Sequence, residues 1–221
     1  MEQKVLTSEQ ERALAVISRH PALASSFYLS GGTALTAYYL QHRYSDDLDF
    51  FTAEKEFPQT AVEAVIRDMQ TALDAPEAEY RRLHDRRVFF MRTTSGELKI
   101  EFTFYPFPRL NPSIPHEGIA VDSLEDISAN KLMALIDRIE SKDFVDLYFL
   151  MNKKKMTIAR IADLVRRKFS LTLDPLTLGS ELAKARFLDA LPRMIAPLTL
   201  VQLKSFFSEE AIRLKPQILE E

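Results

Sequence analysis

The chain has 221 residues, of which 46% are hydrophobic and 28% charged, with no cysteine and no tryptophan. This composition is that of an ordinary globular protein with room for one large domain or two small ones. Without cysteine there are no disulfides, thiolate metal sites or cysteine nucleophiles, so any catalysis depends on carboxylates, hydroxyls, lysine or histidine. No stretch approaches the roughly eighteen consecutive apolar residues that span a bilayer, and residues 1–11 are acidic where a signal peptide needs an apolar core. We therefore expect a cytoplasmic protein without a membrane partner.

The first 105 residues alternate between helical and strand patterns, which predicts a mixed α/β front. The first helix is expected to begin with a capping box of Ser8 and Glu11 and to end before Pro21. Helical spacing is found over 7–20, 33–41 and 58–73. The strand pattern is found over 27–29, over 46–51 and in three runs between 79 and 105, with a hairpin turn at 93–96.

Four prolines between residues 105 and 118 prevent a helix or a central strand, so this stretch is expected to be an extended connector. We place a domain boundary at its end, which gives a first domain over 1–118 and a second over 119–221. Beyond it, helical spacing is found over 126–152, 158–169, 179–194 and 200–214, with short breaks at Pro175, Pro192 and Pro197. This pattern predicts an all-helical C-terminal domain.

Two carboxylates share one face of the strand expected over 46–51. Asp47 and Asp49 are two residues apart, so their side chains project from the same side, about 7 Å apart along the chain. Their mutual repulsion is tolerable near water, a basic partner or a divalent cation. Glu101 lies on the polar face of another expected strand and is a candidate third carboxylate. The alternatives are an exposed edge strand for the two aspartates and a cross-strand ion pair with an arginine for Glu101.

A Gly-Gly turn precedes the acidic strand. The run Ser30-Gly31-Gly32-Thr33 lies between an expected strand and an expected helix, where glycines let the backbone approach a ligand and free amides favour phosphate. Soon afterwards the chain returns with Arg43, Ser45 and the paired aspartates. A phosphate cradle followed by a two-carboxylate metal clamp is the arrangement that phosphoryl or nucleotidyl transfer requires.

Two stretches resemble a known family. The run from Ser30 to Leu35, followed by His42-Arg43-Tyr44-Ser45-Asp46-Asp47-Leu48-Asp49-Phe50-Phe51, is similar to the signature of the AbiEii/AbiGii toxin family, nucleotidyltransferases of the DNA polymerase β superfamily. A second match runs from Lys131 through Arg138 to Lys142-Asp143 and Asp146. The sequence departs from the family pattern at Glu101, where aspartate is usual, and at Lys142, where arginine is common. Over residues 25–150 the resemblance implies an α+β, polymerase β-like nucleotidyltransferase fold, a mixed sheet with flanking helices that is followed by an all-helical C-terminal domain.

The resemblance also implies roles for individual residues. The ligands of one or two Mg²⁺ ions would be Asp47, Asp49 and Glu101, and Glu101 would also help to deprotonate the attacking hydroxyl. The triphosphate would be held by Ser30, Gly31 and Gly32, with further nucleotide contacts from Ser45, Lys131 and Arg138. Asp143 or Asp146 would orient Lys131 or act as a base.

The second motif carries a geometric expectation. On one unbroken helix, Lys131, Arg138, Lys142 and Asp146 fall within an arc of roughly 80°. A cap at Ser141 would instead divide the segment into two helices and remove this stripe. The alternatives to a ligand-facing stripe are a solvated face and an intramolecular salt-bridge network.

The implied function is Mg²⁺-dependent transfer of a nucleoside monophosphate from a nucleoside triphosphate to an acceptor hydroxyl on RNA, protein or a small molecule. By the same resemblance, we expect the toxin of a type IV toxin–antitoxin pair, with a cognate antitoxin as partner. Residues 1–125 carry a net charge of −6 and residues 126–221 carry +3, so the helical half is the part suited to tRNA or another polyanion. The alternative is a catalytically inactive nucleotide-binding or partner-binding module on the same fold.

Overall fold

The computed structural model describes residues 4–56 and 59–216, and the chain forms two compact units. The first unit comprises Met1–Tyr39 and Ser45–Ser123, and the second comprises Leu40–Tyr44 and Leu124–Glu221. The short segment Leu40–Tyr44 therefore belongs to the second unit, although its chain neighbours on both sides belong to the first. The division into domains at residue 118 stays a prediction. Within the two described ranges, no helix has the length and apolar content needed to cross a membrane.

The described part of the first unit is built on a seven-stranded mixed sheet. Its strands are β1 (Tyr28–Ser30), β2 (Leu48–Thr52), β3 (Ala78–Leu83), β4 (Arg86–Thr93), β5 (Gly96–Phe104), β6 (Ile114–His116) and β7 (Ile119–Val121). The order across the sheet is β3-β4-β5-β2-β1-β7-β6, with β2 parallel to β5 and β1 parallel to β7. The hairpin expected at 93–96 is confirmed, because Thr93 pairs with Gly96. The proline-rich stretch contains only the edge strand β6, which tolerates Pro115, and β7 is a strand that the sequence pattern does not predict.

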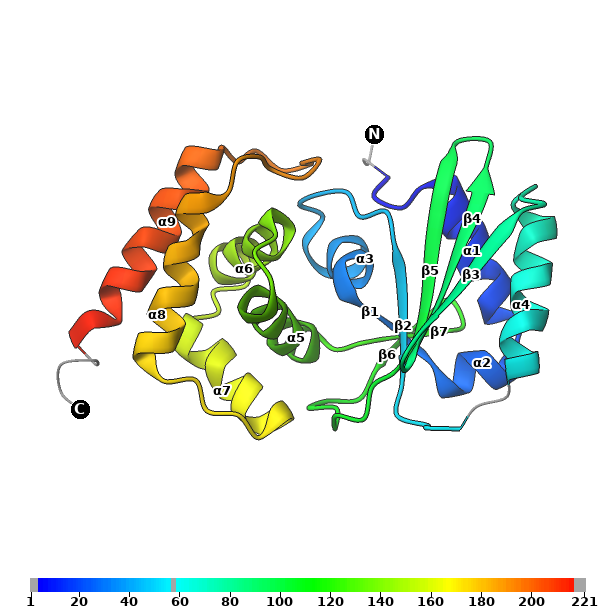
Figure 1. The fold of residues 1–221 in the computed structure, drawn as a ribbon, viewed down its shortest axis with the longest axis horizontal. Coiled ribbons are helices and arrows are strands. Elements are labelled where there is room, and N and C mark those ends of the chain that lie inside the picture. Colours follow the sequence, from blue (N-terminus) through cyan, green and yellow to red (C-terminus); the bar gives the residue numbers. More distant parts are fainter. Residues whose placement is uncertain (1–3, 57–58, 217–221) are drawn as a thin grey trace. The chain divides into compact units, whose positions relative to one another are not determined.

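Helices cover both faces of this sheet. They are α1 (Ser8–Ser18), α2 (Pro21–Ser26), α3 (Gly31–Leu35), which continues as a π-helix over Thr36–Leu40, and α4 (Gln59–Ala72). Figure 1 shows α1, α2 and α4 together on one side of the sheet and α3 on the other. On the first side, Phe50 stacks on Phe102 with ring centroids 5.4 Å apart, and Phe27 packs edge-on against Phe102 at 5.2 Å. Because side chains alternate along a strand, the polar residues next to Phe50 and Phe102 face the α3 side.

The second unit is helical in its described part. Its helices are α5 (Leu124–Asp137), α6 (Ser141–Lys153), α7 (Ile158–Phe169), α8 (Pro175–Ala183), a 3₁₀ helix (Lys184–Phe187) and α9 (Leu200–Arg213). Phe144 packs edge-on against Phe207, which joins α6 to α9 with ring centroids 5.2 Å apart. A fully buried ion pair joins Lys168 of α7 to Asp126 of α5 at 2.7 Å. Because both charges lose their hydration, such a pair fixes the helix packing more than it adds stability.

Two expectations for the helical half are wrong. The chain breaks between α5 and α6, so the unbroken helix and its single charged stripe do not form; the two-helix alternative does, with Glu140 rather than Ser141 as the N-cap. The helix expected over 179–194 begins earlier, at Pro175, and its last helical turn ends at Phe187. Pro192 lacks an amide donor and disfavours a helical residue before it, which accounts for the irregular chain beyond.

The start of α1 differs from expectation by one residue. Thr7 is the N-cap: its side chain accepts a hydrogen bond from the Gln10 amide, and the Gln10 side chain accepts one from the Thr7 amide. The capping box is therefore Thr7 and Gln10 rather than Ser8 and Glu11. Helix α4 confirms the helix expected over 58–73, whose expected first residue, Pro58, lies outside the described residues.

The corrected cap gives a testable prediction. Thr7→Ala should lower the free energy of unfolding by about 1 kcal/mol, because one amide at the helix start loses its acceptor. Ser8→Ala is the matched control, and it should change stability by less than about 0.5 kcal/mol. Urea unfolding of the two variants measures both values. A larger loss for Ser8→Ala than for Thr7→Ala would restore the cap expected from the sequence.

Candidate active site

The predicted acidic residues of the first unit come from two adjacent strands. β2 and β5 are parallel neighbours, and their register pairs Asp49 with Glu101. Side chains at paired positions lie on the same face, which here is the α3 face. Asp47 lies just before β2 rather than within it, and the hydroxyl of Thr33 donates a hydrogen bond to the Asp47 carbonyl. The structure thus brings Asp49 and Glu101 together by strand pairing and fixes the backbone of Asp47 by a contact to α3.

Glu101 is held by an arginine on the neighbouring strand. Arg86 of β4 donates to both of its oxygens, at 2.5 Å from Nε and 2.6 Å from Nη2, and the Thr103 hydroxyl donates at 2.7 Å. Burial raises the pKa of Glu101, but these hydrogen bonds and the charge of Arg86 outweigh it and leave the pKa below its ordinary value. Glu101 is therefore an ionised, nearly fully buried carboxylate, and the cross-strand ion pair, one of the two alternatives for this residue, is present.

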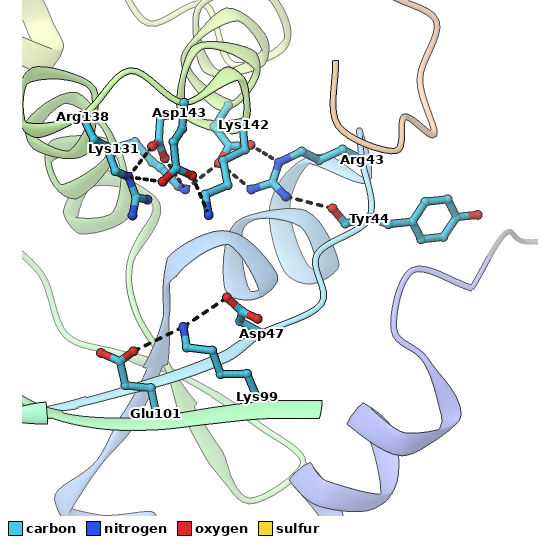
Figure 2. A network of polar contacts seen from close by, with 11 residues as sticks. Arg43, Tyr44, Asp47, Lys99, Glu101, Lys131, Arg138, Lys142 and Asp143 are labelled. Atoms are coloured by element: carbon cyan, nitrogen blue, oxygen red, sulfur yellow. Dashed lines mark hydrogen bonds and ion pairs between the residues drawn. The ribbon is translucent and has the colours of Figure 1, made fainter. Parts of the chain in front are cut away.

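Lys99 lies among the three carboxylates. Its ammonium nitrogen is 3.2 Å from Oδ2 of Asp47 and 3.4 Å from Oε2 of Glu101, as Figure 2 shows. Burial lowers the pKa of Lys99, but the negative charges of Asp49, Asp47 and Glu101 raise it above its ordinary value. The cluster therefore contains a permanent cation that sequence reasoning did not assign. The alternation along β5 carries the signal, because it places Lys99 and Glu101 on the same face.

The glycine turn touches the acidic strand directly. Gly31 has a φ of +70°, and a Cβ at this position would lie 2.4 Å from Oδ2 of Asp49. Glycine is thus required both by the left-handed backbone and by the close approach to the carboxylate. Ser30 makes a different contact. It is fully buried, and its hydroxyl donates a hydrogen bond of 2.8 Å to Oδ2 of Asp122. Gly32 is buried inside α3.

Ser45 stands where the chain leaves the second unit and returns to the first. Its carbonyl accepts a hydrogen bond of 2.7 Å from the side chain of Gln10, which is fully buried at the start of α1. The backbone just before the acidic pair is thereby fixed from both sides, by Gln10 at Ser45 and by Thr33 at Asp47.

In the second unit, Asp146 is the centre of a buried network. Arg43 binds it through two nitrogens, with Nε 2.6 Å from Oδ1 and Nη2 2.8 Å from Oδ2. Nζ of Lys131 lies 2.7 Å from Oδ2, and Nε2 of His42 lies 2.7 Å from Oδ1. Asp143 is the second acid of the network and contacts Lys131 at 3.1 Å and Arg138 at 2.9 Å. Figure 2 shows Lys131, Arg138 and Asp143 lying close together, with Arg43 reaching toward them from the Leu40–Tyr44 segment.

The network fixes the charge states of its members. Burial alone would raise the pKa of Asp146, but Lys131 and Arg43 hold it well below its usual range. Burial lowers the pKa of Lys131, yet Asp146 and Asp143 raise it above the ordinary value. Burial also lowers the pKa of His42, and its Nδ1 has no hydrogen-bond partner among the described residues. A carboxylate so stabilised in its ionised form is a weak base, so this geometry favours orientation of Lys131 as the role of Asp146.

Sequence reasoning missed how the Leu40–Tyr44 segment is held. The carbonyl of His42 accepts hydrogen bonds from the amides of Ile195 and Ala196, both at 2.9 Å, and the Tyr44 amide donates to the carbonyl of Arg193 at 2.8 Å. Arg43 is 103 residues away from Asp146 in the chain, so no local pattern connects the two. Lys142, from the family motif, pairs with Glu140 at 2.8 Å, and Glu140 in turn lies 3.5 Å from Arg138, so Lys142 is linked to the network at its edge.

The side chains of the carboxylate cluster determine how it could bind a metal ion. In the described part of the chain, no three His, Cys, Asp or Glu side chains are grouped so as to hold a metal ion. Asp47 and Asp49 are hard oxygen donors, and Mg²⁺ in proteins is commonly held by one or two carboxylates together with substrate phosphates. These residues fit an ion that arrives with the phosphates of a nucleotide better than an ion held by the protein alone.

Two solved structures share the fold of this chain. JHP933 from Helicobacter pylori matches 100% of this chain and 97% of its own with a TM-score of 0.58 at 24% identity. A second H. pylori protein, described as a candidate nucleotidyltransferase, matches 100% of this chain and 98% of its own with a TM-score of 0.60 at 22% identity. At these identities the likeness establishes the fold, which is that of nucleotidyltransferases.

The family follows from the sequence comparison. A family model described as the nucleotidyl transferase AbiEii toxin of type IV toxin–antitoxin systems matches residues 12–216. An uncharacterised protein of Aquifex aeolicus (strain VF5), aq_aa25, is 34% identical over 168 residues, which cover 74% of this chain and 76% of that protein. The chain belongs to the AbiEii family and is a nucleotidyltransferase. Both the expected family and the expected fold class are confirmed.

The Asp146 network makes the stability of the protein depend on pH. Because the pKa of Asp146 is depressed in the folded state, its contribution is complete above the ordinary aspartate pKa of about 3.9 and is lost as the pH falls below it. Asp146→Asn should lower the free energy of unfolding at pH 7 by about 3 kcal/mol, since Arg43 and Lys131 both lose the buried counter-charge that they share, while Lys131 retains its pair with Asp143. Urea unfolding between pH 7 and pH 3 should show a flatter acid dependence for the variant.

The matched control for this prediction is Asp163→Asn. Asp163 forms an exposed ion pair with Arg166 on α7, so its removal should change stability by less than about 1 kcal/mol. An equal loss in the two variants, or an unchanged acid dependence in Asp146→Asn, would contradict the prediction.

The Gly31 contact gives a second prediction for the site. Gly31→Ala should cost about 1–2 kcal/mol for the left-handed backbone alone and should displace the Asp49 carboxylate as well. Nucleotidyl transfer should fall at least about 100-fold, because a small misplacement of a reacting group can cost that much. Gly179→Ala is the control: it lies in α8 with no atom closer than 3.7 Å to the added Cβ, so it should retain activity. Equal activity of the two variants would show that the turn does not position Asp49.

Proposed function

We propose that this protein moves a nucleoside monophosphate from a nucleoside triphosphate to an acceptor hydroxyl in a Mg²⁺-dependent reaction. The observation that carries the proposal is the contact of the Gly31 turn with the Asp49 carboxylate. A candidate phosphate cradle next to a candidate metal ligand is the arrangement that supports nucleotidyl transfer. Membership of the AbiEii family supports the reaction class and implies a nucleoside triphosphate as substrate and a cognate antitoxin.

In the proposed reaction, an acceptor oxygen attacks the α-phosphorus. A new P–O bond forms as the bond to the bridging oxygen breaks, and pyrophosphate leaves with that electron pair. When bound, Mg²⁺ supplies positive charge that neutralises the phosphate oxygens. Asp47 and Asp49 would hold that ion, and an ionised carboxylate of the cluster would accept the proton of the hydroxyl. Glu101 would serve as third ligand or as proton acceptor in competition with its contacts to Arg86 and Lys99.

The remaining motif residues would bind the nucleotide. Gly31 and Gly32 would hold the triphosphate through the backbone, while Lys131, kept ionised by Asp143 and Asp146, would meet the phosphates. Ser45 and Arg138 are the other proposed nucleotide contacts. Ser30 would act indirectly, because its hydroxyl is bound to the buried Asp122.

For the acceptor, we propose RNA, with tRNA as the first candidate. The net charge of +3 on residues 126–221 supports a polyanion, because basic residues gain affinity by releasing counterions from phosphates. Modification of an RNA is also an activity that could stop growth, as expected of a toxin. Protein and small-molecule hydroxyls are the other acceptors to be tested.

The second candidate function is a nucleotide-binding module without turnover. The pairing of Glu101 with Arg86 favours it, because the third carboxylate is occupied by a protein cation. Calorimetry that finds nucleotide and Mg²⁺ binding, without pyrophosphate release in any acceptor mixture, would support this candidate over the enzyme.

The enzyme proposal is tested by transfer of label. The purified protein, incubated with each α-labelled nucleoside triphosphate, Mg²⁺ and total RNA, should label an RNA species, and Asp49→Asn should reduce the rate at least about 100-fold. Asp46→Asn is the matched control, because this neighbouring aspartate lies outside the Asp47–Asp49 pair. No labelled product with any nucleotide or acceptor, or equal labelling by Asp49→Asn and the wild type, would refute the proposal.

A further inference from the structure

Lys99 lies in the carboxylate cluster but has no role in the proposed reaction. It extends from β5 on the same face as Glu101, and its side chain is 25% exposed. The ammonium nitrogen lies 3.2 Å from Asp47 and 3.4 Å from Glu101. These are distances of direct ion pairs, so the ammonium sits inside the carboxylate cluster rather than at its rim (Figure 2).

The charges around Lys99 show why a cation is needed there. Arg86 binds Glu101 through two hydrogen bonds, and its charge also interacts with that of Asp49. Lys99 adds a second positive charge, which lies directly against Asp47 and Glu101. Like charges in a partly buried site repel one another strongly unless a counter-charge lies among them. The position of the Lys99 ammonium therefore requires a positive charge, which either the ammonium or a metal ion can supply.

We propose that the ammonium of Lys99 holds the cation position of this carboxylate cluster, and that a divalent cation binds there by displacing it. The inference rests on the proposed function only in taking Asp47 and Asp49 as the metal ligands. A lysine suits the role because its charge sits on a flexible four-carbon stem, so it can leave the cluster without movement of the strand.

Displacement has a consequence for metal binding. A free divalent cation must compete with an ammonium that is already paired, so the metal alone binds weakly. A metal that enters with a nucleotide also brings phosphates, which offer the released ammonium new anionic partners. The site is thus selective for the metal–nucleotide complex over the free metal.

The experiment compares Lys99→Met with the wild type, using Mg²⁺ and Mn²⁺ without nucleotide as probes. Calorimetry should show each metal binding at least about 10-fold more tightly to Lys99→Met, because no ammonium competes. In EDTA the variant should melt at a lower temperature than the wild type, and its metal-induced rise in Tm should be larger. Lys99→Gln, which removes the charge but keeps a polar group, gives the same comparison where Lys99→Met does not fold in EDTA.

Two control variants test whether metal affinity depends on a positive charge at position 99 rather than on the net charge of the protein. Lys55→Met removes one positive charge from an exposed site in the same unit and should bind metal with the affinity of the wild type. Lys99→Arg keeps the cation and should bind metal no more tightly than the wild type.

Unchanged or weaker metal affinity in Lys99→Met and Lys99→Gln overturns the inference. If these variants instead lose nucleotide affinity at constant metal affinity, Lys99 is a phosphate contact, and the proposed function stands while this inference falls. If neither the wild type nor the variants bind a divalent cation with or without nucleotide, the metal dependence of the proposed function fails together with it.

Discussion

The parallel pairing of β2 with β5 is the constraint on which the candidate site depends. It places Asp49 directly beside Glu101, while the chain just before β2 adds Asp47. Such a concentration of negative charge on a folded sheet has a free-energy cost that the surrounding residues must offset. Arg86 offsets it from the neighbouring strand β4, and Lys99 does so from β5 itself.

Both units use the same physical arrangement, a buried acid whose charge is matched by several cations. In the second unit, Asp146 pairs with the cations Arg43 and Lys131 and is hydrogen-bonded to the imidazole of His42. Buried ion pairs of this kind add little net stability, because desolvation consumes most of the attraction, but they permit few alternative geometries. In the proposed reaction, their value would be that the charges are oriented before the substrate arrives, which is a large source of electrostatic catalysis.

Much of the fold was predictable, because the patterns that specify it are local. The alternation within 98–104 correctly predicted β5, and helical spacing correctly predicted α7. The short motif around Asp47 and Asp49 correctly predicted the family. The rest depends on contacts between distant residues. The sequence leaves Glu101 open between a metal ligand and an ion-pair partner, and it does not show that Arg86 of the neighbouring strand lies beside it. Likewise, nothing near Arg43 in the chain points to Asp146. In the helix expected over 179–194, the break at Pro192 was expected, but the helical segment runs from Pro175 to Phe187 and so begins and ends earlier than the spacing predicts.

The membership of Leu40–Tyr44 in the helical unit affects how such a protein can be rearranged in evolution. A single crossover near residue 123 between two family members would unite the Arg43 of one parent with the Asp146 of the other. The hybrid keeps its buried counter-charge only when both parents have compatible side chains at these two positions and along 193–196, which pairs with the segment. Residues 124–221 therefore cannot be exchanged on their own. A successful chimera must take the five residues Leu40–Tyr44 from the same parent as the helices that contact them.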